Sequence, residues 1–211
     1  MIGRYGDYFA FLGLPRRLNL DREALEQRFR TLSRQFHPDF FYNATPAERR
    51  GSLERSSYLN DAYRTLKHPI ARIEYLLELE GTEPAAGQSP SNGTRRSTDV
   101  PASLLEEVFA LNEQLEAVRD MRAAGAPVEE WRTGLELARK PIEARRVEHE
   151  QQLVALSEEW DALADQKADG RKRQAVLHAL RERMLERNYI NNLLAGIDRE
   201  LEKLTASDRV T

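Results

Sequence analysis

Large apolar residues recur at helical spacing along most of this chain, and no stretch alternates apolar and polar residues as a strand does. Between Asp21 and Pro38, four of them fall at i, i+4, i+7 and i+11, namely Leu25, Phe29, Leu32 and Phe36. This spacing gives a helix one apolar face. Proline and glycine residues separate the successive patterns, because they end helices. The sequence therefore predicts an all-α fold.

Four helices are expected in the first 80 residues, over about 5–12, 22–37, 46–67 and 70–80. Gly13 follows the first, Asp21 is an N-cap candidate for the second, and Pro38 ends that second helix. Thr45 is followed three residues later by Glu48, which is the spacing of a capping box.

Three longer helices are expected after residue 100. The first runs from Pro101 to Ala124, the second begins near Pro127, and the third follows Gly170. Pro141 lies inside the second pattern and is expected to kink or interrupt that helix. Because short connections make consecutive helices antiparallel neighbours, the pattern predicts an antiparallel three-helix bundle.

The segment from Gly81 to Val100 differs from the rest in composition. It contains three Gly, two Pro and many Ser and Thr, and Val100 is its single large aliphatic residue. Such a stretch buries too little apolar surface to offset the entropy lost on ordering. We expect an N-terminal domain over 1–80, a linker or mobile loop over 81–100 and a C-terminal domain over 101–211.

Composition excludes several classes of function. The chain has no Cys, so it can form no disulfide, thiolate metal site or cysteine nucleophile. Its 32 Lys and Arg are balanced by 35 Asp and Glu, which argues against nucleic-acid binding. No apolar run approaches the roughly 20 residues of a membrane span. Because the first residues do not resemble a secretory signal, a soluble cytoplasmic protein is expected.

The turn His37-Pro38-Asp39 lies between two amphipathic helices. Arg30 and Arg34 precede His37 at helical spacing, so the three share a face that differs from the apolar one. A basic strip ending in a polar turn suits docking to an acidic partner. Taken alone, these are also ordinary turn residues and solvated arginines. A catalytic His–Asp pair is a third reading, although no nucleophile lies at a recognisable spacing.

Three stretches together resemble the J-domain of the HscB co-chaperones of iron–sulfur cluster assembly: DYFAFLGLP, LDREALEQRFRTLSRQFHPDFF and LNDAYRTLKHPIARIEYLLELEG. The resemblance covers nearly all of residues 7–81. It implies that His37, Pro38 and Asp39 engage an HscA/DnaK-type chaperone and stimulate its ATPase, assisted by Arg30 and Arg34. Phe40 is a departure, since the family often has Lys or Arg after the HPD motif.

The predicted helix from Pro101 carries more apolar surface than one seam needs. The core repeat is Leu104, Val108, Leu111, Leu115 and Val118. Leu105 and Phe109 lie beside that repeat, and the pattern alone favours a core role for both. Between Pro101 and Asp120, five acids accompany them against the single base Arg119: Glu106, Glu107, Glu113, Glu116 and Asp120.

The resemblance to HscB reverses that preference. It implies that Leu105, Phe109, Glu113, Glu116 and Tyr189 bind an IscU-type scaffold protein. An apolar patch with an acidic rim would suit a basic, partly apolar partner surface. The charges of the two halves fit different partners. Residues 1–80 carry 13 basic and 11 acidic residues, whereas the remainder carries 19 basic and 24 acidic residues.

The expected function is therefore that of a co-chaperone and not of an enzyme. One chain would hold the scaffold and present it to the ATPase, which promotes cluster transfer. A helical adaptor, or a general J-protein with another client, is the alternative. His149 lies on an apolar stripe and is expected in the core, while His68 and His178 lack a partner at metal spacing. No metal or cofactor is expected.

Overall fold

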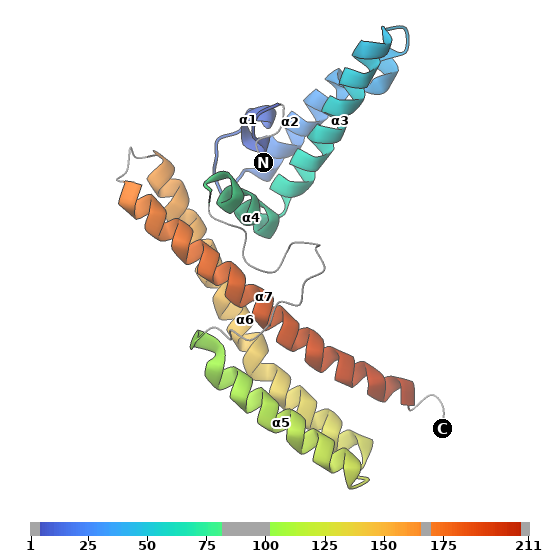
Figure 1. The fold of residues 1–211 in the computed structure, drawn as a ribbon, viewed down its shortest axis with the longest axis vertical. Helices are drawn as coiled ribbons and strands as arrows, with labels where there is room; N and C mark the ends of the chain where they lie inside the picture. The colour runs from blue at the N-terminus through green and yellow to red at the C-terminus, as the bar shows by residue number, and fades with distance from the viewer. Residues whose placement is uncertain (1–4, 82–101, 166–169, 208–211) are drawn as a thin grey trace. The chain divides into compact units, whose positions relative to one another are not determined.

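The computed structural model describes residues 5–81, 102–165 and 170–207. In this part of the chain every regular element is a helix (Figure 1). The all-α prediction is therefore confirmed. None of the helices described has the length and apolar content that crossing a membrane would require.

All four helices expected in the first 80 residues are present. They are α1 (Tyr8–Leu12), α2 (Arg22–Gln35), α3 (Pro46–Lys67) and α4 (Pro69–Leu79), with a 3₁₀ turn, η1 (Pro38–Phe41), between α2 and α3. Helix α1 begins later than expected because Asp7 is its N-cap and accepts a hydrogen bond from the Ala10 amide. It ends at Gly13, whose φ of 65° is left-handed.

The predicted caps of the next two helices are also present. The Asp21 carboxylate accepts a hydrogen bond from the Glu23 amide at the start of α2. Thr45 and Glu48 form the complete capping box of α3, each side chain bonding the other's backbone amide. These local bonds set where the two long helices of the N-terminal region begin.

The C-terminal region contains α5 (Leu105–Ala123), α6 (Val128–Asp165) and α7 (Gly170–Ser207), preceded by the 3₁₀ turn η2 (Ala102–Leu104). Helix α6 is continuous through Pro141, so of the two expected effects, a kink or an interruption, the interruption does not occur. Pro141 is exposed, whereas Ala138 and Ile142 beside it are buried. Packing of these neighbours keeps the backbone helical despite the missing amide hydrogen.

The chain divides into two compact units. Unit 1 comprises Met1–Gly87 and Ala155–Arg181, and unit 2 comprises Gln88–Val154 and Glu182–Thr211. Helices α6 and α7 thus contribute to both units. The predicted linker over 81–100 falls almost wholly outside the described residues, so the domain boundaries drawn from it remain a prediction.

The core of the N-terminal helices joins all four of them. Its buried members are Phe9, Leu12, Leu25, Leu59, Ala62, Leu66 and Tyr75. Phe29, Leu32 and Phe36 pack against this cluster, as the stripe on α2 predicts. The Phe29 and Tyr63 rings stack with their centroids 4.2 Å apart, which joins α2 to α3. Figure 1 shows these two helices as a hairpin.

The core of unit 2 takes residues from the turn η2 and from all three of its helices. They are Leu104, Leu111 and Val118, then Leu135, Ala138 and Ile142, then Ile190, Leu194 and Ile197. Helices α5 and α6 lie side by side (Figure 1), and a Cβ at Gly134 would come within 3.2 Å of the Val118 side chain. The predicted three-helix packing is therefore present.

Candidate functional site

The His37-Pro38-Asp39 turn is ordered by its own hydrogen bonds. Nδ1 of His37 accepts a hydrogen bond from the Asp39 amide at 3.3 Å and lies 3.5 Å from Oδ2 of Asp39. The Phe40 amide donates to the His37 carbonyl at 3.1 Å. The His37 and Asp39 side chains are nevertheless 51% and 86% exposed. The turn therefore fixes the His37 imidazole by a hydrogen bond and leaves both polar groups accessible to a partner.

Contacts from α1 and α3 fix the start of this turn. The Ser52 hydroxyl of α3 donates to the Phe36 carbonyl at 2.9 Å. The Phe36 ring stacks on Phe11 of α1 at 6.0 Å, and the guanidinium of Arg55 lies 5.8 Å from the same ring. Phe36, the residue before His37, is thus held by one contact from α1 and two from α3.

Arg30 and Arg34 are exposed on α2, as expected. Arg30 forms an i,i+4 ion pair with Glu26 at 3.3 Å, which is a weak surface interaction. Phe40 is 74% exposed, and its ring lies edge-on to the His37 imidazole at 6.2 Å. An exposed aromatic ring therefore stands beside the HPD histidine, at the position that departs from the family resemblance.

Leu105 and Phe109 face solvent on α5, with 40% and 70% of their surfaces exposed. The pattern-based preference for a core role is therefore wrong for both. Glu113 and Glu116 are exposed farther along the same helix. Tyr189 of α7 is partly buried and packs against the core cluster that contains Leu104 of η2 and Leu111 of α5. The acidic residues and Tyr189 thus belong to the unit that carries the exposed apolar pair.

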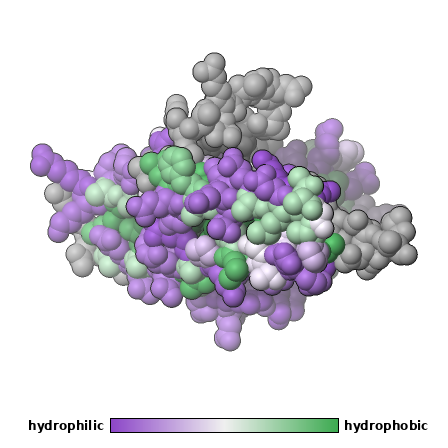
Figure 2. Space-filling view, turned by 90° about the horizontal axis from the view of Figure 1, so that it is seen from below, coloured by the Kyte–Doolittle hydropathy of each residue, from purple (hydrophilic) through white to green (hydrophobic). Residues whose placement is uncertain are grey.

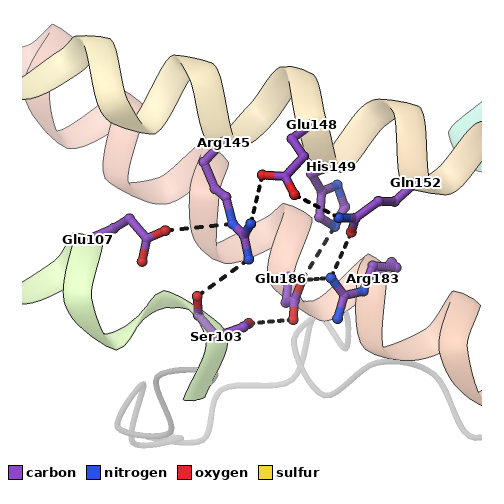
Figure 3. Close-up of polar contacts among 8 residues, drawn as sticks. All are labelled: Ser103, Glu107, Arg145, Glu148, His149, Gln152, Arg183 and Glu186. Carbon is purple, nitrogen blue, oxygen red and sulfur yellow. Dashed lines mark hydrogen bonds and ion pairs between the residues drawn. The ribbon is translucent and has the colours of Figure 1, made fainter.

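A polar network lies at the beginning of α5 (Figure 3). The Ser103 hydroxyl donates to Oε1 of Glu186 at 2.6 Å, and Nη1 of Arg183 lies 2.7 Å from Oε2 of Glu186. On α6, Arg145 lies 3.7 Å from Glu107 and 2.8 Å from Glu148. The sequence analysis did not find this network. The one sequence signal of this network is Glu186, an acidic residue four positions before the core residue Ile190.

His149 is buried beside this network, as its place on the apolar stripe predicts. Burial lowers the pKa of the His149 imidazole, although a hydrogen bond to the Arg183 backbone and the nearby Glu186 oppose the shift. Nε2 of His149 lies 3.8 Å from Oε2 of Glu186. Burial among the packed helices therefore favours the neutral imidazole.

A second polar cluster that sequence reasoning missed lies in unit 1. Nη1 of the buried Arg72 donates to the Leu18 carbonyl at 2.7 Å. The Leu18 and Asn19 amides donate to the two carboxylate oxygens of Asp161 on α6, at 2.7 and 2.8 Å. Burial lowers the pKa of the Arg72 guanidinium, against the attraction of Asp161. These contacts join the α1–α2 connection to α6.

In the comparisons with known proteins, no family model matches the chain. The chaperone HscB from Vibrio cholerae is 27% identical, and the match covers 94% of this chain and 99% of that one with a TM-score of 0.55. The crystal structure of the human co-chaperone protein HscB matches at 24% identity over 94% of this chain and 83% of that one, with a TM-score of 0.59. Both similarities extend over almost the whole chain.

Within the ranges described, no three His, Cys, Asp or Glu side chains gather in a group that could hold a metal ion.

Proposed function

The chain belongs to the HscB family of co-chaperones, and we propose that it acts as a co-chaperone in iron–sulfur cluster assembly. In this proposal, its J-domain, helices α1–α4, stimulates the ATPase of an HscA/DnaK-type chaperone. Its three-helix bundle binds an IscU-type scaffold protein. The observation that carries the proposal is the ordered and exposed His37-Pro38-Asp39 turn in a chain that is similar to HscB over almost its whole length.

The ATPase contact is proposed to centre on His37, Pro38 and Asp39. A hydrogen bond within the turn holds the His37 imidazole before a partner arrives, so less conformational entropy of that side chain is lost on binding. Arg30 and Arg34 add positive charge on the adjacent face of α2, which suits an acidic partner surface. The proposed ATPase contact is supported by the exposure of these side chains and by the geometry of the turn.

The scaffold contact is proposed to centre on Leu105 and Phe109. Both are exposed, although they lie on a helix whose opposite side is packed in a core. Glu113 and Glu116 place negative charge farther along α5, and Tyr189 supplies a half-buried aromatic ring from α7. This combination fits a basic, partly apolar surface. Binding both partners would raise the local concentration of scaffold at the ATPase.

The first test replaces His37 with glutamine. We expect His37→Gln to abolish stimulation of the chaperone in a steady-state ATPase assay, because the imidazole is exposed and makes only local contacts. The circular dichroism spectrum should not change. His68→Gln is the matched control, since His68 is exposed and its side chain makes no cap bond to α4. Unchanged stimulation by His37→Gln would remove the proposed J-domain activity.

The second test replaces Phe109 and Tyr189 together with alanine. We expect scaffold affinity, measured by calorimetry, to fall about tenfold or more, since buried aromatic contacts dominate most interfaces. Stimulation of the ATPase in the absence of scaffold should be unaffected. Leu137→Ala, at an exposed leucine of α6, is the matched control. If the double variant binds as well as the original chain, the proposed scaffold surface is wrong.

A further inference from the structure

The turn η2 and the first turn of α5 contact the two other helices of unit 2 at three points, and Figure 3 shows the two polar contacts. Leu104 is almost fully buried in the core. One residue earlier, the Ser103 hydroxyl bonds Glu186 of α7 at 2.6 Å. Three residues after Leu104, the Glu107 carboxylate lies 3.7 Å from Arg145 of α6. These ties come from both neighbouring helices.

The spacing of these ties determines which side of α5 faces outward. Leu105 lies two residues before Glu107 and Phe109 two residues after it, and two residues correspond to about 200° around an α-helix. A Glu107 side chain that points toward α6 therefore places Leu105 and Phe109 on nearly the opposite side. Their exposure, 40% and 70%, agrees with this geometry.

The groups that receive these ties are themselves held in place. Glu186 is buried and also pairs with Arg183 at 2.7 Å, and Nε2 of the buried His149 lies 3.8 Å from its Oε2. Arg145 pairs with Glu148 at 2.8 Å, and its Nη2 donates to the Ser103 carbonyl at 3.5 Å. These side chains are partly or fully removed from water. Removal of one of them therefore leaves the polar or charged group of its partner without a hydrogen bond or a counter-charge.

We propose that Ser103, Glu107, Arg145 and Glu186 are positioning residues. They fix the rotation of the first turn of α5 and thereby set how Leu105 and Phe109 are presented to the scaffold. This inference rests on the proposed function of that surface. It gives Glu107 a role different from that of the exposed Glu113 and Glu116, because Glu107 is half-buried against α6.

The test is a double-mutant cycle with Glu107→Gln, Arg145→Gln and the combined variant. Each single change is expected to weaken scaffold binding about three- to tenfold, and the combined variant is expected to bind no more weakly than either single variant. Hydrogen exchange of the α5 amides that follow Leu105 should speed up in all three variants in the absence of scaffold. Glu150→Gln, at an exposed acid of α6, controls for the loss of one charge.

A direct contact of Glu107 with the scaffold would give a different result. Arg145→Gln would then leave both affinity and exchange unchanged, and this outcome would overturn the inference. Ser103→Ala removes only a hydroxyl and tests the tie to α7 without loss of a buried charge; it should speed the same amides. If the unaltered chain does not bind the scaffold, the proposed function fails, whereas hydrogen exchange still decides whether these residues position α5.

Discussion

At the scale of single residues, Asp7 combines two stabilising contacts at the start of α1. Its carboxylate accepts the Ala10 amide at 2.9 Å and lies 2.6 Å from the Arg16 guanidinium. Burial by itself would raise the pKa of Asp7, but these hydrogen bonds and the charge of Arg16 outweigh it and lower the pKa below 3.8. The ionised form is therefore favoured in the folded protein.

This shift predicts a dependence of stability on pH. Because the folded pKa of Asp7 is lowered, its contribution is fully present above the ordinary value of 3.8 and is lost as the pH falls through the folded value. Asp7→Asn should lower the free energy of unfolding by about 1 kcal/mol at neutral pH, since asparagine keeps the cap but loses the charge. Urea unfolding of the two proteins at pH 7 and at pH 3 measures this loss of stability. An equal loss at both pH values would contradict the stabilising charge assigned to Asp7.

Sequence reasoning found the residues whose partners lie nearby in the chain. Asp21 and the Thr45–Glu48 pair were predicted as caps because each bonds an amide within three residues. Asp161 and Glu186 were missed, since their partners Leu18 and Ser103 lie 143 and 83 residues away. The exposure of Phe109 was implied by family resemblance and not by the helical pattern, which cannot tell a core face from a binding face.

At the scale of elements, apolar spacing located every long helix because burial of one face requires that spacing. The effect of Pro141 could not be predicted in the same way. The proline lowers the stability of the helix locally, whereas burial of Ala138 and Ile142 favours a continuous helix. Only the folded core shows which of these two free energies is larger. Helix continuity through a proline is thus a property of the assembled bundle.

Two helical glycines should respond oppositely to substitution. Gly196 of α7 has nothing within 4 Å of an added Cβ, so Gly196→Ala should stabilise the chain by about 0.5–1 kcal/mol through helix propensity. Gly134 of α6 faces Val118 across the α5–α6 contact, so Gly134→Leu should destabilise it by about 1–3 kcal/mol through overpacking. Thermal unfolding of the two variants compares them. A stable Gly134→Leu variant would show that α5 does not need this close approach.

At the scale of the whole molecule, two helices serve both units. The buried residues Trp160 and Leu177 lie in the two long helices that the sequence analysis assigned to the bundle, yet both fall in the part of the chain grouped with the first 87 residues. Helical spacing shows that a side chain is buried, but not which element buries it. The sequence therefore could not reveal that unit 1 takes part of α6 and α7.

The Asp161 cluster should be important for the stability of unit 1. Asp161→Ala leaves the Leu18 and Asn19 amides without their acceptor and removes the charge nearest Arg72. We expect a loss of about 1–3 kcal/mol and faster hydrogen exchange of both amides. Exchange at core positions of unit 2, such as Leu194, should not change. Glu159→Ala, at an exposed acid of the same helix, is the control; equal effects of the two variants would contradict this role.

The discontinuity of unit 1 has a consequence for synthesis on the ribosome. The core of α1–α4 uses buried residues between Phe9 and Tyr75 only, so it can assemble as soon as this segment leaves the exit tunnel. Its contact with Asp161 must wait until more than 80 further residues have been added, because Asp161 lies that far beyond Tyr75 in the chain, although its partner Leu18 is among the first residues made. The J-domain of a nascent chain is therefore folded before α6 exists, and unit 1 is completed in a second step.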